Sequence, residues 1–368
     1  MAIGTAVPAK DITAMPCLAL VMIVRNEARC IARCLDSVRG HVDAMIVLDT
    51  GSTDDTVAIA EACGATVHHF DWCDDFAAAR NAALDYSDAD WNLILDADEW
   101  LEGDVGALGR ATLPPAPAPA RFIGCVRIVN RTASDQPVAR KFVPRILPRG
   151  VRYEGRIHEQ PVSPLPMKVL PLAVRHDGFD GAQLARKAGR NEALLRAELD
   201  ADPGDSYFWF QLGREHLVRG KPDEAADALM TAHRTGTPDS AWRQGVVVAA
   251  LQALKRAERF DEALAFADAE HAHWQRSPDF FFAVADLYLE HASRNPGIAM
   301  VELLPIVEGA WKRCLEIGER PDLDGSVEGC GSHLAAQNLA MLYETLGIDD
   351  EAQSYAAMAA EMRERLAA

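Results

Sequence analysis

The chain has 368 residues, of which 49% are apolar and 25% are charged, and its formal net charge is −18 at pH 7. This length suits about two domains, and the apolar content suffices for packed cores. The negative charge argues against nucleic acid as a partner, because a phosphate-binding surface needs clustered Lys and Arg.

The eight cysteines show no spacing typical of a metal site or a redox pair. They stand at positions 17, 30, 34, 63, 73, 125, 314 and 330, and without such a spacing they are expected to be reduced and mostly buried. Residues 1–16 lack a basic region followed by a long apolar stretch, and no apolar run approaches the ~18 residues of a membrane span. We therefore expect an N-terminal tail over 1–16 and a cytoplasmic protein without a transmembrane segment.

The first half of the chain alternates between strand-like and helix-like patterns. The segments are LALVMIV at 18–24, ARCIARCLDSVRG at 28–40, AMIVLDTGS at 44–52, TVAIAEACG at 56–64 and TVHHF at 66–70. Such alternation predicts a mostly parallel α/β sheet with helices on both faces. A proline-dense stretch at 113–120 predicts an exposed loop, and 121–129 and 141–150 extend the β-rich part.

Polar side chains follow three of the predicted strands. Asn26 and Glu27 follow the first, Asp49 and a Gly-Ser turn end the second, and Asp96 and Asp98 follow the run NLIL. Because parallel sheets bind ligands beyond the carboxyl ends of their strands, we expect these clusters to converge on one polar crevice. The Asp-x-Asp pattern alone is weak, since solvated turns also produce it.

From residue 181 onward the pattern is almost entirely helical. We expect a linker helix over 181–204 and tetratricopeptide-like repeats over 205–368, with a generic helical bundle as the alternative. The 34-residue repeat template aligns its packing positions with Trp209, Leu212, Gly213, His216, Ala225, Leu229 and Ala232. Residues 200–368 carry 29 acidic and 15 basic side chains, net −14, which reflects solvated helix faces or a surface suited to a neutral or basic polypeptide.

Six stretches carry a resemblance to a known family. They are IVRNEARCIARCLDSV, IVLDTGSTDDTVAIA, DDFAAARNAAL, NLILDADEW, YEGRIHEQPV and RHDGF. In this order, over about residues 17–180, they resemble the family 2 glycosyltransferases, which have the GT-A fold. The similar subgroup has a tetratricopeptide-like tail and includes bacterial peptide S-glycosyltransferases that modify cysteine in bacteriocins. The resemblance implies a GT-A domain over 17–180 and a metal-dependent, inverting hexosyltransferase.

The resemblance also assigns residues to the donor. Asp98 would hold Mg²⁺ or Mn²⁺, with His176 as a second ligand, because a nucleotide sugar needs a cation at its diphosphate. Asp96 would support the ribose or the metal's waters. Asp49 matches the carboxylate that contacts uracil or ribose, although Thr50 replaces the second aspartate of that motif.

Further residues complete the expected donor site and supply the base. Arg80 would direct its guanidinium towards the phosphates, and Asn26 and Glu27 would line the donor crevice. Glu159 aligns with the acidic motif that supplies the general base, and His158 is the alternative. The donor expected from the family is a UDP-sugar.

Two other kinds of protein remain open at this point. A nucleotidyltransferase can share the Asp-x-Asp site but usually has a glycine-rich, basic loop after its first strand. A scaffold would use the helical array with an inactive front domain. The acceptor also remains open: a polypeptide held by the array, or a saccharide or lipid-linked acceptor, in which case the array would serve homodimer formation or docking.

Overall fold

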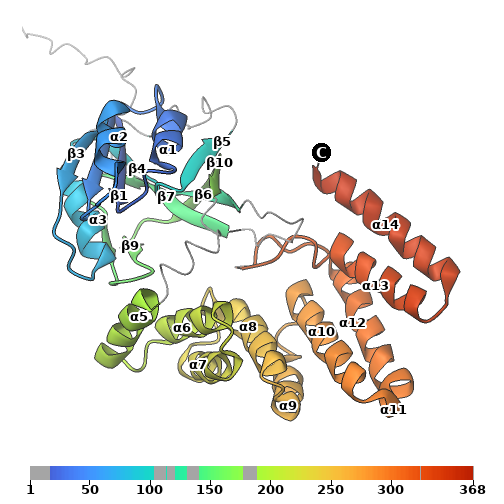
Figure 1. Cartoon of the computed structure of the whole chain (residues 1–368). Helices are drawn as coiled ribbons and strands as arrows, with labels where there is room; N and C mark the ends of the chain where they lie inside the picture. The colour runs from blue at the N-terminus through green and yellow to red at the C-terminus, as the bar shows by residue number, and fades with distance from the viewer. Residues whose placement is uncertain are drawn as a thin grey trace, which may run out of the picture. The chain divides into compact units, whose positions relative to one another are not determined.

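A computed structural model describes residues 17–102, 113, 121–130, 141–176, 189–323 and 325–367. The chain divides into two compact units, 1–131 with 142–180 and 132–141 with 181–368 (Figure 1). The expected N-terminal tail, the proline-dense loop apart from Leu113, and the predicted boundary near residue 180 lie outside the described residues.

The first unit is built on an eight-stranded sheet of order β3-β2-β1-β4-β7-β6-β10-β5. The strands are β1 (Leu18–Val24), β2 (Ala44–Asp49), β3 (Thr66–His69), β4 (Trp91–Ile94), β5 (Glu99–Glu102), β6 (Ile123–Asn130), β7 (Lys141–Pro148) and β10 (Met167–His176). Strands β3, β2, β1 and β4 are parallel, as are β6 and β10. Strand β7 runs antiparallel to β4, and β5 antiparallel to β10. The predicted mostly parallel sheet is confirmed.

Helices cover both faces of this sheet. Helices α1 (Ile31–Val38) and α2 (Thr56–Ala62) pack on one face and α3 (Phe76–Asp85) on the other. Strand side chains alternate between faces, so Leu20 joins the core under α1 and α2, while Val21 joins the core under α3. Because both faces are buried, the strand reads as a continuous apolar run.

A short hairpin completes the first unit beside α3. Strands β8 (Arg152–Glu154) and β9 (Gln160–Val162) pair antiparallel. The Asn81 side chain of α3 donates to the Tyr153 carbonyl at 2.9 Å and accepts from the Tyr153 N–H at 2.8 Å. This two-way amide contact fixes the hairpin against the helix.

From residue 189 onward, the regular elements that the structure describes in the second unit are helices. Its elements are α5 (Arg190–Ala201), α6 (Ser206–Val218), α7 (Pro222–Thr235), α8 (Arg243–Arg256), α9 (Phe260–Glu270), α10 (Pro278–Arg294), α11 (Pro296–Ile298), the π-helix η3 (Ala299–Leu303), α12 (Leu304–Ile317), α13 (His333–Thr345) and α14 (Asp349–Ala367). Neighbours in sequence pack together, and α6, α8 and α10 also contact one another in succession. Among the residues described, no helix combines the length and apolar character needed to cross a membrane.

Helices α6 and α7 form a pair that matches the tetratricopeptide template. A Cβ on Gly213 would lie 2.4 Å from Leu229 Cγ, so glycine is needed where the two helices approach most closely. Ala225, Leu229 and Ala232 are fully buried in α7. The triplet Asp-Glu-Ala occurs at 223–225, 261–263 and 350–352. These triplets lie in the first turns of α7, α9 and α14, where acidic side chains suit the helix dipole.

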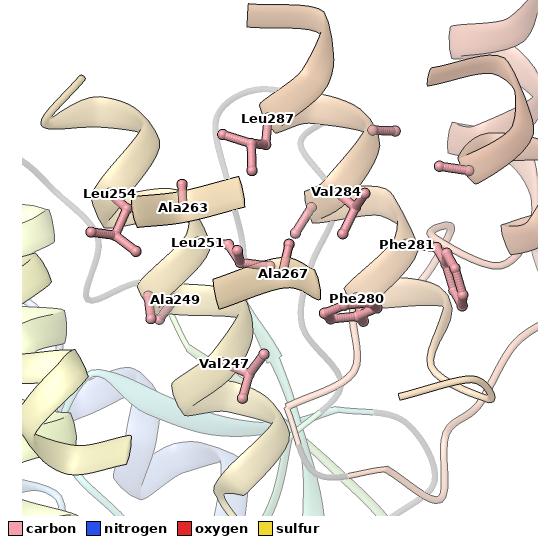
Figure 2. Close-up of a cluster of buried hydrophobic side chains, with 14 of the residues drawn as sticks. Val247, Ala249, Leu251, Leu254, Ala263, Ala267, Phe280, Phe281, Val284 and Leu287 are labelled. Atoms are coloured by element: carbon pink, nitrogen blue, oxygen red, sulfur yellow. The ribbon is translucent and has the colours of Figure 1, made fainter. Parts of the chain in front are cut away.

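The core of the helical unit is continuous across several helices. Figure 2 shows Leu254 and Leu251 of α8 near Ala263 and Ala267 of α9. Val247 of α8 and the α10 side chains Phe280, Val284 and Leu287 belong to the same hydrophobic cluster. Small alanines let the helices approach, and Phe280 is fully buried. The second unit therefore buries a hydrophobic core of its own.

Candidate active site

The carboxyl ends of β1, β2 and β4 place three loops at one edge of the sheet. Strand β1 pairs in parallel with both β2 and β4, so their carboxyl ends face the same way. Asn26 follows β1, Asp49 ends β2, and Asp96 follows β4. This is the edge where parallel sheets bind ligands.

The loops after β1 and β2 are tied to each other by hydrogen bonds. Asn26 has a left-handed backbone with φ 54°, and its side-chain oxygen accepts the Thr53 N–H at 2.7 Å. The Asn26 N–H donates to Ser52 Oγ at 2.9 Å, and the Glu27 N–H to Thr56 Oγ1 at 2.8 Å. These contacts fix the two loops to each other at this edge of the sheet.

Asp49 is buried and caps its own turn. Its Oδ2 accepts the N–H groups of Gly51 and Ser52 at 3.1 and 3.0 Å, and only 4% of the residue is exposed. His69, at the end of β3, has its Nδ1 3.7 Å from the same oxygen. Asp49 thus shapes the turn beside the expected nucleotide, and its direct contact with ribose or uracil stays a prediction.

Asp96 lies between two buried arginines. Arg80 Nη2 donates to its Oδ1 at 2.8 Å, and Arg145 Nη2 donates to its Oδ2 at 3.0 Å. Burial alone would raise the pKa of Asp96, but the two guanidinium groups outweigh it and hold the pKa well below its usual range. The carboxylate is therefore ionised at any pH at which the protein would work.

Glu99 is the second carboxylate held by Arg145. Arg145 Nη2 donates to Glu99 Oε1 at 2.6 Å, and the Asp96 N–H donates to Glu99 Oε2 at 3.0 Å. Burial raises the pKa of Glu99, and Arg145 offsets only part of that rise. Arg145 and Glu99 thus brace the loop that carries Asp96.

Glu159 reaches the same network from the β8–β9 hairpin. Arg80 Nε donates to Glu159 Oε1 at 2.5 Å, so one guanidinium joins the expected base to Asp96. The Tyr153 ring lies 5.6 Å from the Arg80 guanidinium carbon, a distance typical of a cation–π contact. Neighbouring His158 is exposed and has φ 53°. The structure therefore directs Glu159, rather than His158, towards Arg80.

Exposure separates Asp96 from the other charged members of the network. Its side chain is 39% exposed, compared with 9% for Arg80, 10% for Arg145, 12% for Glu159 and 5% for Glu99. Asp96 is thus the member that a ligand reaches most easily. Arg80 was expected to meet the phosphates, and here its guanidinium contacts two carboxylates; its role at the phosphates stays a prediction.

Asp98 and His176 form a second group beside the network. His176, the last residue of β10, is paired in register with Glu99 of β5, and its Nε2 lies 3.5 Å from Asp98 Oδ2. Burial lowers the pKa of His176, but the hydrogen bond and charge of Asp98 more than offset it, so the net pKa is raised. The two side chains expected to share a cation are therefore neighbours.

The chemistry of these two donors fits a divalent cation. Mg²⁺ and Mn²⁺ accept carboxylate oxygen and tolerate imidazole, and Mg²⁺ commonly takes one or two protein ligands together with substrate phosphates and water. Over the described ranges, no three His, Cys, Asp or Glu side chains form a metal-holding group. A cation held by these two side chains would take its other ligands from water or from a bound molecule.

The sequence places Glu99 in the same acidic cluster as Asp96 and Asp98, but it does not identify Arg145 as a member of the site. Arg145 stands inside the run KFVPRILP, which forms β7. A charged residue within an otherwise apolar strand is seldom buried without a partner. The position of Arg145 in the sequence therefore already indicated a buried arginine paired with a carboxylate. Its partners could not be identified, because β7 and β4 are far apart in sequence.

Comparisons with known proteins find sequences similar to this chain. Residues 19–108 match the sequence model of the family described as Glycosyl transferase family 2. A tetratricopeptide-repeat-containing protein of Synechococcus elongatus is 34% identical over 246 residues, 62% of this chain and 60% of that protein. The SPbeta prophage-derived glycosyltransferase SunS of Bacillus subtilis is 29% identical over 247 residues, 62% of this chain and 56% of that protein. The chain thus covers less than two thirds of these curated relatives.

A solved structure shows a weaker similarity. Glucosyl-3-phosphoglycerate synthase from Mycobacterium tuberculosis, crystallised with Mn²⁺, UDP and glucosyl-3-phosphoglycerate, is 26% identical. The match covers 35% of this chain and 51% of that chain, with a TM-score of 0.26.

Proposed function

We propose that this chain, which carries a family 2 glycosyltransferase domain at residues 19–108, transfers a hexosyl group from a nucleotide-sugar donor to an acceptor with inversion. The donor is a UDP-sugar and the cation is Mg²⁺ or Mn²⁺. The observation that carries this proposal is the network in which Arg80 joins Asp96, at the carboxyl end of β4, to Glu159 on the hairpin. The network supports the proposal because it brings Asp96, the carboxylate proposed for the donor, close to Glu159, the proposed base.

On the donor side, Asp96 and Asp98 have different roles. Asp96 is fixed by two arginines and partly exposed, which suits it to accept hydrogen bonds from a ribose or from metal-bound water. Asp98 and His176 would hold the cation. When bound, this cation supplies positive charge to the diphosphate leaving group.

On the acceptor side, Glu159 takes a proton. The acceptor's nucleophilic atom forms a bond to the anomeric carbon while the bond from that carbon to the phosphate oxygen breaks. Arg80 donates to Glu159 Oε1, so Oε2, which lacks that charged donor, is the oxygen that takes the acceptor's proton. A positioned general base of this kind contributes about 10²- to 10⁴-fold to a rate.

The donor half is tested on the full chain by a thermal-shift screen of nucleotide sugars, with and without Mn²⁺. We expect a UDP-sugar to raise the melting temperature only with the cation. Asp98→Ala should abolish that shift, while Asp36→Ala, which removes an exposed carboxylate paired with Arg39, should retain it. A metal-independent shift in Asp98→Ala would refute the cation assignment.

For the acceptor we propose a polypeptide held by the helical unit. Residues 200–368 have a net charge of −14, which favours neutral or basic segments, and a helical array offers an extended surface for many weak contacts. Removing the second unit, after checking that the first still folds and hydrolyses donor, should abolish transfer to peptide while hydrolysis persists. Undiminished transfer to a small saccharide would instead support a saccharide acceptor.

A further inference from the structure

Arg145 has a place in the sheet that brings it to the end of β4. In the antiparallel pair of β7 and β4, Ile146 lies opposite Leu93, and Arg145 is the next residue of β7 in the direction of the β4 carboxyl end. The guanidinium therefore reaches the loop that carries Asp96. This position follows from strand register and does not depend on a flexible loop.

The contacts of Arg145 are concentrated on one nitrogen. Its Nη2 donates to Asp96 Oδ2 at 3.0 Å and to Glu99 Oε1 at 2.6 Å. Its Nε is buried and has no hydrogen-bond partner among the residues that the structure describes. The side chain thus serves two carboxylates and leaves one of its own polar atoms unsatisfied.

Fold stability does not account for this arrangement. Burying a guanidinium and a carboxylate costs free energy that their attraction repays only in part, and apolar residues of similar size often do as well or better. An unsatisfied buried N–H adds to the cost. A buried charge at the edge of a ligand site is better explained by what it does to the site.

What Arg145 does is fix the orientation of Asp96. With Arg80 on Oδ1 and Arg145 on Oδ2, the plane of the carboxylate is set from both sides. Each oxygen still has a lone pair with which to accept a further hydrogen bond. Losing Arg145 would leave Asp96 held on one side only and next to the uncompensated charge of Glu99.

We infer that Arg145 is a positioning residue for the donor, acting through Asp96. The inference rests on the proposed function, since it assumes that Asp96 contacts a nucleotide sugar. Arg145 touches neither donor nor acceptor; it presents the Asp96 carboxylate in one orientation, so that no binding energy is spent on ordering it. Donor affinity, rather than the rate of the chemical step, is the quantity that depends on it.

A double-mutant cycle on nucleotide affinity tests this inference. UDP binding in the presence of Mn²⁺ is measured by calorimetry for the wild type, Arg145→Met, Asp96→Asn and the double variant. When Asp96 is present, we expect Arg145→Met to weaken UDP binding about 10-fold or more. When Asp96 is replaced by Asn, the same substitution should weaken binding less than about 3-fold, because the effects of substitutions within one network are not additive. In donor hydrolysis, KM should rise while kcat changes little.

The control is Arg149→Met, which removes an exposed arginine just after β7 that donates to the Ala89 carbonyl; its affinity should equal that of the wild type. If Arg145→Met does not fold, Arg145→Met with Glu99→Gln replaces it and is compared with Glu99→Gln alone. Equal losses in both Asp96 backgrounds, or no loss, would overturn the inference. A wild type that binds no UDP would instead remove the proposed function, and the inference with it.

Discussion

Glu159 is the side chain on which transfer depends most directly in the proposed mechanism. Glu159→Gln keeps an oxygen that can accept from Arg80 but removes the base. We expect donor affinity within about twofold of the wild type and transfer reduced by roughly 10²-fold or more, measured with UDP release and product formation.

His158→Ala is the matched control for Glu159→Gln, because it alters the neighbouring exposed residue. It should leave transfer largely intact. If His158→Ala abolishes transfer and Glu159→Gln does not, the base has been assigned to the wrong neighbour.

We expect Asp279 to make the stability of the helical unit depend on pH. It lies in the first turn of α10, is 4% exposed, and accepts the Val327 N–H at 2.7 Å. Burial raises its pKa from the usual 3.8 to about 6. Between these two pKa values the folded chain keeps the proton on Asp279 and the unfolded chain releases it. The contribution of Asp279 to the free energy of unfolding is therefore complete below about pH 4 and is lost as the pH rises to about 6.

The predicted loss is about 3 kcal/mol for a rise in pKa of two units. Urea unfolding followed by circular dichroism from pH 4 to pH 7 measures it. Asp279→Asn can still accept from Val327 and should flatten the pH profile of the helical transition. A profile as steep as that of the wild type would show that other groups cause the dependence.

At the scale of elements, the strands and helices of the first half of the chain could be predicted from the sequence because the strands are buried on both faces. The predicted run 18–24 is β1 itself (Leu18–Val24), and the helices α1 and α2 lie within the predicted segments. A parallel sheet produces unbroken apolar runs, which stand out from the polar loops between them. Local pattern therefore sufficed for these elements and for the strand-end carboxylates.

The side-chain contacts across the site could not be predicted from the sequence in the same way. That Arg80 would join Asp96 to Glu159, and that Arg145 would join Asp96 to Glu99, depends on the sheet order β4-β7 and on the packing of the β8–β9 hairpin on α3. Both bring together residues distant in sequence. The sequence shows which charged side chains are present, but it does not show which of them pair with one another.

Helix packing in the α6–α7 pair makes glycine necessary at one position. Gly213→Ala would place a Cβ 2.4 Å from Leu229 Cγ. We expect the helical unit to lose roughly 1–3 kcal/mol, the usual cost of overpacking a core, and its melting temperature to fall.

The matched variant is Gly309→Ala in α12, where a new Cβ meets nothing within 4 Å. It should stabilise the same unit by up to about 1 kcal/mol, since alanine favours helix over glycine. Circular dichroism melts of both variants give the comparison. A Gly213→Ala protein at least as stable as the wild type would contradict the close helix approach.

At the scale of the whole molecule, each unit has its own core. Two hydrophobic clusters of described residues lie within the sheet unit, and a third lies within the helical unit. Cooperative unfolding follows shared cores, so we expect two calorimetric transitions. Gly213→Ala should lower one of them and leave the other in place; a single transition shifted as a whole would contradict this.

Because each unit has its own core, inactivating substitutions should fall into two classes, according to which core they disrupt. A substitution that disrupts the packing shown in Figure 2 would reduce the folded helical unit without altering the Asp96 network. Such an allele would keep donor hydrolysis and lose the acceptor step. A substitution in the sheet core would lose both, so a mutant collection scored for the two activities would map the boundary between the units genetically.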